Sequence, residues 1–574
     1  MSNNIWKINQ LSAEQTVLRD NLASSLGLPE AACSMLVLRG ITTPEQATAF
    51  LEPKVSQLHD PFLMTDMQNA VERLDKAIEG KEKILIYGDY DVDGTTSVAL
   101  VYRFLRTLNL DLQYYIPDRY TEGYGISWKG IDFAAECGCT LIIALDCGIK
   151  AVDKVSYAKD KGIDFIICDH HTPGEQIPHA AAVLNAKRAD CHYPYDELSG
   201  CGVGFKLVQA YIKYKNLDPK ILNDLLELVA MSIASDVVPL TGENRVLAYY
   251  GLRQINSSPS IGLRSLLSVA GIEGQKITIS DLVYKVGPRI NASGRMKSGA
   301  EAVELLITED EELAKEKSEL INGYNEERRD KDTQTTKDAL ALLEADPENA
   351  EKKTTVVFAR GWNKGVVGIV ASRLTETYYR PTIVLTDSDE GLISGSARSA
   401  GGFDIYSAIE SCSDLLTNFG GHVFAAGLTM KEENLDEFKR RFEQYVSTHI
   451  TDDQQRRTIT VDAQLNFSDI TNELYSTISK LEPFGPENPV PQFVTYNAVN
   501  SRYSRRVGKS NEHLKLDLTD GTAVASGIAF GKGEMADYLL SGNAVDLCYK
   551  IDLNEYKNRT FLQLMVVDIR EKNR

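Results

Sequence analysis

The sequence has no long apolar run, no paired cysteine motif and little positive charge. No apolar run reaches the roughly 18 residues that a membrane-spanning helix needs, so we expect no membrane segment. The first residues, Met1 to Lys7, lack a charged stretch followed by an apolar one, and we expect no secretory signal. The 9 cysteines are scattered and form no C-x-x-C pair, which argues against a disulfide framework or a structural zinc site. Together these absences predict a reduced, cytoplasmic protein.

Basic residues are outnumbered: 62 Lys and Arg face 81 Asp and Glu, for a formal net charge of −19. Taken alone, this charge argues against a nucleic-acid partner, because such binding is driven by the neutralisation of phosphates. Two effects weaken that exclusion. Carboxylates that bind cations lose their negative field, and local patches matter more than the total.

Three aspartates alternate between a strand-like run and a helix-forming run. Asp89, Asp91 and Asp93 follow the apolar run 84–87 and precede the run 97–108. This pattern predicts a loop at the carboxyl end of a strand, which is where open α/β sheets bind ligands. Carboxylate oxygens in such a place suit hard divalent cations.

Two other acidic or phosphate-binding loops fit this segment less well. An EF-hand would have Glu at the twelfth position counted from Asp89, where Leu100 stands, and a helix rather than a strand would precede it. A P-loop would need a Gly-Lys-Ser/Thr sequence, which does not follow. A metal site at a strand end is therefore the favoured interpretation.

Further metal-type ligands come directly after other apolar runs. Asp146 and His170 follow strand-like runs, and Asp236 ends a helical one. A lone aspartate in such a place is more often a helix N-cap, but the ends of parallel strands converge on one edge of a sheet. The joint pattern predicts a centre for two Mg²⁺ or Mn²⁺ ions about 3.5–4 Å apart, as in phosphatases and nucleases. Its candidate ligands are Asp91, Asp93, Asp146, His170 and Asp236.

The order of the runs predicts an α/β protein with two α/β lobes joined by a long helix and followed by a β-barrel. From about 70 to 240, strand-like and helical runs alternate in the manner of a parallel sheet. Residues 300–350 are rich in Glu, Lys, Arg, Ala and Leu, which predicts a long exposed helix. After 456 short β runs dominate, as in a small barrel of the oligonucleotide-binding (OB) type. The predicted strands are 84–87, 112–116, 140–145, 164–168, 181–184, 355–358, 382–385, 523–530, 545–551 and 561–567, with a helix over 366–377.

This order predicts five segments along the chain, each with its own composition. They are a helical leader (1–50), a first α/β lobe with the acidic motifs (51–299), a connector helix (300–352), a second α/β lobe (353–450) and the OB-type barrel (456–574).

Four segments in order resemble the successive motifs of the DHH phosphoesterase superfamily. They are Asp89–Gly94, Asp146–Gly148, Asp169–His171 and Ser235–Asp236. The length and five later segments are similar to the bacterial single-strand-specific exonucleases of that superfamily, and the resemblance covers nearly the whole chain from about 70 onward. The later segments are Gly287–Met296, Gly361–Ile369, Gly395–Ser399, Gly420–His422 and Glu482–Pro489.

The resemblance implies a DHH catalytic lobe, a connecting helix, a DHHA1 lobe and an OB-type barrel. It implies 5′→3′ degradation of single-stranded DNA to mononucleotides with Mn²⁺ or Mg²⁺, in recombination and repair. It assigns metal binding to the five candidate ligands named above, and it implies a single-strand-binding protein as partner. Asp89 would be a further ligand or an orienting group, and His171 would face the scissile phosphate as an acid or a hydrogen-bond donor. We expect the protein to be a monomer.

The resemblance and local chemistry also predict contacts to the substrate. Arg295 is expected near the strand backbone, and we interpret Arg119, Ser396 and Arg398 as the group that recognises the 5′ end, because a guanidinium binds phosphate bidentately. Ser399 belongs to the same donor cluster, and His422 would hydrogen-bond a phosphate unless Gly420 and Gly421 form a helix cap. A basic stretch with one aromatic suits single strands. It contains Arg502, Tyr503, Arg505, Arg506, Lys509, His513 and Lys515.

Two other functions stay open at this point. A DHH phosphodiesterase of short oligonucleotides or cyclic dinucleotides would be shorter and would lack the region 456–574. A catalytically silent DHH protein that only binds nucleic acid would have lost ligands, whereas here the acidic set is complete. Asn363-Lys364 and Ala397 depart from the His-Gln and Gly of many relatives, and neither change affects that set.

Overall fold

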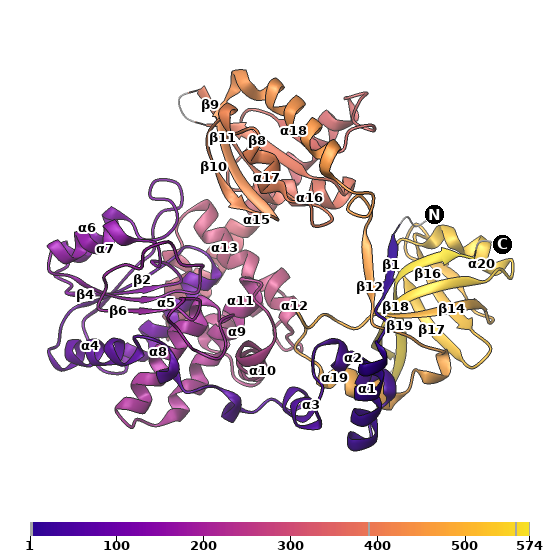
Figure 1. The fold of residues 1–574 in the computed structure, drawn as a ribbon, viewed down its shortest axis with the longest axis horizontal. Helices are drawn as coiled ribbons and strands as arrows, with labels where there is room; N and C mark the ends of the chain where they lie inside the picture. Colours follow the sequence, from indigo (N-terminus) through magenta and orange to yellow (C-terminus); the bar gives the residue numbers. More distant parts are fainter. Residues whose placement is uncertain (1–3, 389–390, 557–558, 573–574) are drawn as a thin grey trace. The chain divides into compact units, whose positions relative to one another are not determined.

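The protein folds as two compact units in this computed structural model (Figure 1), which describes residues 4–388, 391–556 and 559–572. One unit comprises Glu45–Glu326 together with the short segment Lys480–Val490. The other comprises Met1–Pro44, Glu327–Ser479 and Pro491–Arg574. The domain boundaries expected from the sequence remain predictions.

The unit that begins at Glu45 is built on a parallel sheet of five strands in the order β3-β2-β4-β5-β6. Each strand predicted for this region is confirmed to within one residue at its ends. The chain passes from β2 to β3 on one side and then returns to β4 on the other, so that a topological switch point lies between β2 and β4. The strands are β2 (Ile84–Gly88), β3 (Leu112–Tyr115), β4 (Leu141–Leu145), β5 (Asp164–Cys168) and β6 (Ala182–Leu184).

Helices cover both faces of this sheet. Ile84 and Ile86 belong to one apolar core, with side chains of α4, α5, α8 and α9, while Leu85 and Tyr87 belong to a second core with α6 and α7. Burial on both faces explains why these strands read as continuous apolar runs instead of alternating ones. The helices are α4 (Met67–Glu79), α5 (Val92–Arg106), α6 (Trp128–Glu136), α7 (Val152–Asp160), α8 (Gly200–Tyr214) and α9 (Leu226–Ser235).

Helices also make up the rest of this unit after α9. They end in the long helix α15, which is one helix over Glu311–Glu344 and continues from this unit into the other. The predicted single helix over 300–352 is divided: residues 300–307 form a separate, largely buried helix, and Asp310 starts α15 by accepting a hydrogen bond from the Leu313 N–H at 3.0 Å. The helices before α15 are α10 (Gly242–Ser257), α11 (Ile261–Val269), α12 (Ile279–Asp281), a π-helical turn (Leu282–Val286), α13 (Gly287–Met296) and α14 (Ala300–Ile307).

The second unit contains a mixed sheet of five strands in the order β10-β11-β9-β8-β7. The strands predicted over 355–358 and 382–385 and the helix over 366–377 are confirmed, while β9, β10 and β11 are additional. Helix α16 packs on one face of the sheet and α17 and α18 on the other. The elements are β7 (Thr355–Phe358), α16 (Val367–Tyr378), β8 (Thr382–Asp387), β9 (Leu392–Arg398), α17 (Ile405–Glu410), β10 (Leu416–His422), β11 (Ala425–Lys431) and α18 (Leu435–His449).

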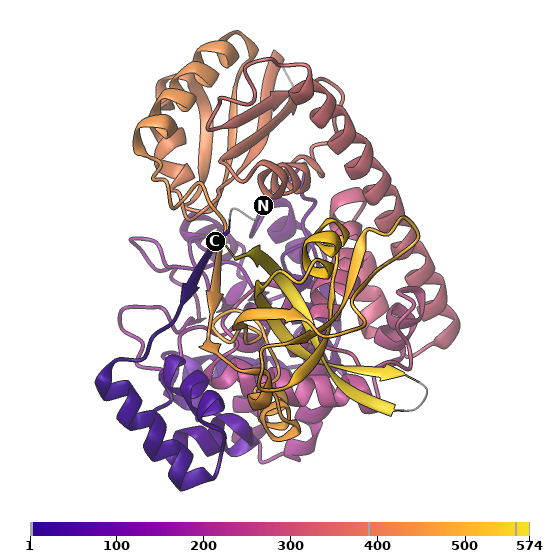
Figure 2. The same cartoon turned by 90° about the vertical axis from the view of Figure 1, so that its right-hand side faces the viewer.

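The C-terminal region is rich in strands, as expected. Its sheet has the order β13-β14-β18-β19-β17-β16-β15, and a further pairing of β14 with β16 brings the order back on itself. These strands are the yellow elements at the front of Figure 2. The elements are β12 (Thr458–Val461), β13 (Ala463–Gln464), α19 (Asn472–Lys480), β14 (Phe493–Asn500), β15 (Arg505–Val507), β16 (His513–Thr519), β17 (Val524–Ala529), α20 (Ala536–Leu540), β18 (Val545–Tyr556) and β19 (Arg559–Glu571).

The N-terminal leader is not only helical. A strand, β1, precedes its helices and pairs in parallel with β12, so that Ile5 lies opposite Thr458. The elements are β1 (Ile5–Ile8), α1 (Ala13–Leu26), α2 (Glu30–Leu38) and α3 (Pro44–Leu51). Among the described residues, no helix is long and apolar enough to cross a membrane.

A candidate metal centre

The three alternating aspartates lie where β2 gives way to α5. Asp89 lies on the short loop that was expected, but the helix begins at Val92 and not at residue 97, so that Asp91 is the N-cap of α5 and Asp93 lies in its first turn. Asp91 starts the helix early because its side chain accepts a hydrogen bond from the Gly94 N–H at 3.0 Å. Gly94 allows this tight turn, since a Cβ there would lie 2.3 Å from the backbone oxygen of Asp89.

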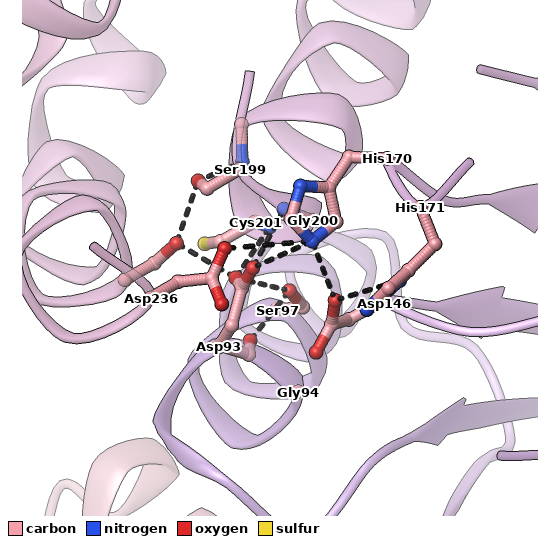
Figure 3. A network of polar contacts seen from close by, with 12 residues as sticks. Asp93, Gly94, Ser97, Asp146, His170, His171, Ser199, Gly200, Cys201 and Asp236 are labelled. Carbon is pink, nitrogen blue, oxygen red and sulfur yellow. Dashed lines mark hydrogen bonds and ion pairs between the residues drawn. The ribbon is translucent and has the colours of Figure 1, made fainter. Parts of the chain in front are cut away.

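The other candidate ligands meet Asp93 at the switch point of the sheet (Figure 3). Asp146 follows β4, His170 follows β5, and Asp236 ends α9. The Nε2 atom of His170 lies 3.2 Å from Asp146 Oδ1, 3.5 Å from Asp236 Oδ2 and 3.7 Å from Asp93 Oδ2. The structure thus brings together side chains from four separate segments of the chain, as the convergence of strand ends predicts.

Asp93 is held in place by the helix that faces it. Its Oδ2 accepts a hydrogen bond from the Gly200 N–H at 2.7 Å, and its Oδ1 accepts one from the Cys201 N–H at 2.8 Å. Both N–H groups belong to the first turn of α8, whose N-terminus carries partial positive charge. The Ser232 hydroxyl donates a third bond, at 2.7 Å. Gly200 is also required by space, because a Cβ there would lie 2.6 Å from that of Asp146.

Asp169 orients the histidine pair. This buried carboxylate accepts hydrogen bonds from the N–H groups of Ile149, His170 and His171 and lies 2.8 Å from the His171 Nδ1. The Tyr124 hydroxyl lies 3.0 Å from His171 Nε2 and 3.2 Å from His171 Nδ1. Asp169 and Tyr124 therefore both contact the ring of His171, which remains part-exposed beside Asp146.

Burial and mutual repulsion raise the pKa of several carboxyl groups in the centre. Burial, followed by the charge of Asp91, raises the pKa of Asp89 to about 7. Burial, followed by Asp93 and Asp91, raises the pKa of Asp236 to about 9. The pKa values of Asp91 and Asp146 are raised for the same reasons. Such shifts mark a cluster of like charges, and a divalent ion among these carboxylates would reverse them.

The two histidines are shifted in opposite directions. Burial lowers the pKa of His170, so that its imidazole is neutral, the form that binds metals. Burial also opposes protonation of His171, but the hydrogen bond with Asp169 outweighs it and raises the pKa of His171. The same contact, against the effect of burial, holds the pKa of Asp169 below its usual value.

The donor set of this centre fits a pair of hard divalent cations. Five of its buried atoms make no hydrogen bond within the described part of the chain: both carboxylate oxygens of Asp89, Oδ1 of Asp146 and the two ring nitrogens of His170. Buried polar atoms are rarely left without a partner. Two groups of ligand atoms within 4.8 Å of one another share His170, one with Asp146 and His171 and one with Asp93 and Asp236. Mostly carboxylate ligands favour Mn²⁺ or Mg²⁺.

Two predicted substrate contacts lie beside this centre. The Arg119 guanidinium lies over the Tyr90 ring, 4.9 Å from its centroid, on the segment that follows β3. Arg295 is in α13, where its backbone carbonyl accepts a hydrogen bond from the Tyr120 hydroxyl at 2.6 Å. Both residues therefore border the aspartate segment.

The predicted 5′-end group is divided between the two units. Ser396 and Arg398 lie within β9, not after it, and in the other unit from Arg119. The strand register places Arg398 opposite Ala425 of β11, which lies opposite His422 of β10, so that Arg398 and His422 share a face of the sheet. Gly420, Gly421 and His422 are thus part of a strand and not a helix cap. The Ser399 hydroxyl is already engaged, since it donates to the Phe403 carbonyl.

A cavity of ≈ 390 Å³ opens on the same face of the sheet. Ser396 lines it together with Lys364 and the glycines 420 and 427. Gly427 lies opposite both Ser396 and Gly420, so Ser396 carries the one side chain in this row of the cavity floor. Such a floor allows a phosphate or a base to approach the backbone closely.

The basic stretch of the C-terminal region lies on both faces of a hairpin. Arg505 is directly opposite Lys515 on adjacent strands, and both are exposed. Arg506 points the other way and pairs with Asp537 at 2.8 Å. Arg502 and Tyr503 are exposed just before β15. Like charges that face each other across a hairpin are unfavourable without an anion between them.

Several residues that shape the centre were missed by the sequence analysis. Asp169 was noted only as part of a motif, and the backbone of Gly200 and Cys201, the Ser232 hydroxyl and Tyr124 were not considered. The one available signal was Ser199 before a Gly-rich helix start, since a serine N-cap places free N–H groups at that point. Which group those N–H groups face depends on the fold alone.

Comparison with known proteins agrees with this architecture. Family models match at three places: the DHH family N-terminal domain (83–233), the DHHA1 domain (351–448) and the RecJ OB domain (461–568). The single-stranded-DNA-specific exonuclease RecJ of Bacillus subtilis is 36% identical over 564 residues, which is 98% of this chain and 70% of that protein. The chain belongs to the RecJ family. RecJ of Escherichia coli is 30% identical, over 94% of this chain and 96% of its own length.

Solved RecJ structures share the fold. The crystal structure of RecJ from Thermus thermophilus in complex with Mn²⁺ matches with a TM-score of 0.84 and 26% identity, over 100% of this chain and 80% of that one. The same protein in complex with Mg²⁺ matches with a TM-score of 0.79 and 25% identity, over 100% and 79% of the two chains. Both RecJ structures contain a metal of the class that the donor set of this RecJ-family chain suits.

Proposed function

We propose that this protein is a metal-dependent exonuclease that hydrolyses single-stranded DNA from its 5′ end to mononucleotides, in recombination and repair. The observation that carries the proposal is the convergence of carboxylates and an imidazole, with unpartnered buried atoms, at the switch point of a RecJ-family chain. The family match extends over the second lobe and the OB region. That extent favours long strands as the substrate over cyclic dinucleotides.

In this proposal the cations are held by Asp91, Asp93, Asp146, His170 and Asp236. Two bound divalent ions supply an activated water and stabilise the charge that develops on the phosphate. The residues keep this arrangement rigid: α8 holds Asp93, and the N-cap position fixes Asp91. Asp89 lies beside Asp91 and its two oxygens make no hydrogen bond within the described residues, which would suit a further ligand or a group that orients the ligands.

His171 is proposed to act on the scissile phosphate from the exposed side of the centre. Asp169 holds its ring and favours the protonated form, so the ring is suited to donating a proton or a hydrogen bond to a phosphate oxygen. The Tyr124 hydroxyl, within 3.2 Å of both ring nitrogens, also limits the rotation of the ring. Both neighbours position His171 and are not themselves expected to touch the substrate.

Contacts to the strand are proposed to come from both units. Arg119 and Arg295, next to the centre, would bind backbone phosphates near the point of cleavage. Arg505 and Lys515 would also bind the strand, and a phosphate between them would relieve their repulsion. Arg502 and Tyr503 would add to this surface, whereas Arg506 is committed to Asp537.

The test of this function is a time course on a single-stranded oligonucleotide labelled at its 3′ end, in Mn²⁺. We expect labelled products that shorten progressively from the 5′ end and no cleavage of a blunt duplex. An oligonucleotide that stays at full length, while dinucleotides are hydrolysed, would instead support a phosphodiesterase of small substrates. Binding without hydrolysis would indicate a catalytically silent DHH protein.

Arg398→Ala is expected to remove most of the preference for a 5′-phosphate. The guanidinium shares a face with Ser396 and His422 beside the cavity, where it would bind a terminal phosphate. We expect the ratio of kcat/KM for 5′-phosphate over 5′-hydroxyl ends to fall about tenfold, since a charged hydrogen bond contributes about 1.5–3 kcal/mol. Arg440→Ala on α18, where Arg440 pairs with Glu437, serves as the control. An unchanged ratio would make the assignment wrong.

Partner, assembly state and location are proposed on the same basis. A single-strand-binding protein would deliver the substrate, the protein would act as a monomer, and it would work in the cytoplasm. Co-sedimentation with a single-strand-binding protein, and light scattering of the protein alone, test the first two points.

A further inference from the structure

A row of exposed side chains runs along the helical segment that borders the metal centre. The segment 279–296 begins as α12, continues through the π-helical turn and ends as α13. Its inner side touches the centre twice. A Cβ at Gly287 would lie 2.8 Å from Ser235 Oγ, next to Asp236, and one at Gly294 would lie 2.6 Å from the backbone oxygen of Tyr90. The segment therefore packs directly against residues that neighbour the proposed metal ligands Asp236 and Asp91 in the chain.

The outer side carries a cation at one end and an exposed ring at the other. Pro288, Asn291 and Arg295 are spaced i, i+3 and i+7, so they share one face of α13 and are part-exposed. Tyr284 lies one turn earlier, within the π-helical turn, and its residue is 76% exposed. That is the largest exposed fraction among the large apolar side chains of the described residues.

The ring of Tyr284 is left in solvent, where it is accessible to a ligand. An aromatic side chain gains stability by burial, and this one is left in solvent while its neighbours Leu282 and Val286 pack into the core. The π-helical turn adds a residue to the helix, and such turns occur frequently at functional sites. The nearest part of the molecule with a known kind of ligand is the metal centre.

We propose that Tyr284 stacks on a base of the single strand as the strand leads away from the metal centre. The inference rests on the proposed function and adds the residue that determines which strand lengths bind well. Arg295 would hold a phosphate near the centre, and the helix would carry the strand from there towards Tyr284. Stacking on one ring accepts any base, which suits an enzyme that must degrade every sequence.

The length of the helix sets the length of strand that reaches the ring. Tyr284 and Arg295 are 11 positions apart in the chain, which is about 16 Å along a helix axis. A stacked strand advances about 3.4 Å per nucleotide, so the ring would meet a base about five nucleotides from the phosphate at Arg295. Substrates of two or three nucleotides should not reach Tyr284 at all.

The experiment compares the wild type with the variants Tyr284→Ala, Tyr284→Phe and Tyr214→Ala. For each protein, kcat and KM are measured on a 5′-phosphorylated dinucleotide and on an oligothymidylate of about twelve nucleotides. Tyr214 is 43% exposed near the end of α8 and serves as a matched control. We expect Tyr284→Ala to raise KM for the oligomer about tenfold with little change in kcat. For the dinucleotide, both kcat and KM should stay unchanged. Tyr284→Phe, which keeps the ring, should behave as the wild type.

Binding is measured separately by fluorescence anisotropy of the labelled oligomer in EDTA, where hydrolysis does not proceed. Tyr284→Ala should weaken binding about tenfold there as well. Equal affinities and equal KM values for Tyr284→Ala and Tyr214→Ala would overturn the proposal, as would an equal loss on the dinucleotide. If the wild type hydrolyses neither substrate, the proposed function fails, while the anisotropy series still decides whether Tyr284 binds the strand.

Discussion

Replacing Asp146 by asparagine should lower kcat by at least about a thousandfold and, without metal, raise the melting temperature. Asp146 belongs to the ligand group of His170 and His171 and lies 3.2 Å from His170 Nε2. An amide of the same shape supplies no anionic oxygen, and loss of metal-assisted charge stabilisation is worth several kcal/mol, about 4 kcal/mol per thousandfold. Without metal, however, the same change removes a buried charge that Asp93, Asp91 and Asp236 repel.

The two effects have opposite signs, which separates this prediction from simple misfolding. We expect Asp146→Asn to melt about 2–4 °C above the wild type in EDTA, as for a gain of about 1 kcal/mol. Single-turnover hydrolysis of a labelled single strand measures the rate, and scanning calorimetry measures the melting. Asp224→Asn, an exposed aspartate in the same unit, is the control for the chemical change. Retention of more than a tenth of the activity would exclude Asp146 from the metal centre.

The first sheet could be read from the sequence because its physics is local. A parallel strand with both faces buried is a short continuous apolar run, and Leu141–Leu145 shows this pattern without interruption. The candidate ligands followed from a rule of topology, since side chains after such strands meet at one edge. Asp146 and His170 were therefore placed together correctly although 23 residues of sequence lie between them.

Features that depend on distant partners could not be predicted. Strand β1 has only four residues, and its partner β12 lies some 450 positions later, so no local pattern distinguishes it from a loop. The role of Asp169 depends on the N–H of Ile149 being within 2.9 Å, which only the fold decides. The early start of α5 is an intermediate case: Asp91 is a typical N-cap residue, but its metal-binding pattern favoured a loop.

The basic hairpin formed by β15 and β16 likewise depends on a feature that its composition does not reveal. Six basic residues and one aromatic predicted a single nucleic-acid surface, yet the alternation of a strand sends Arg505 and Arg506 to opposite faces. Only the face with Arg505 and Lys515 keeps unfavourable like charges together. Charge composition located the surface, and the strand register was needed to divide it.

Removing the metal should make the stability of the protein fall steeply as the pH rises from 6 to 9. The raised pKa values of Asp89, about 7, and Asp236, about 9, exceed the ordinary value of 3.8 for an unfolded aspartate. A group whose pKa is raised by folding binds its proton more tightly in the folded state. The stability that each of these two carboxyl groups contributes is therefore complete below about pH 4. The contribution of Asp89 is lost as the pH rises through about 7, and that of Asp236 as it rises through about 9. Asp169, whose pKa is lowered, acts in the opposite sense only at acid pH.

Saturating Mn²⁺ should reverse this trend, because the cation binds the deprotonated carboxylates and takes the place of the protons. At about 100 times its dissociation constant, a ligand adds about 2.7 kcal/mol, or about 5–10 °C for a unit of this size. We expect the melting temperatures in Mn²⁺ and in EDTA to be close at pH 6 and to differ by at least about 5 °C at pH 8.5. Asp146→Asn should reduce the difference in melting temperature between Mn²⁺ and EDTA, and it should flatten the dependence of the melting temperature on pH in EDTA. Asp224→Asn should leave both quantities unchanged. A separation that is constant with pH would show that these carboxyl groups do not titrate with the metal, and the assignment of the centre would then be wrong.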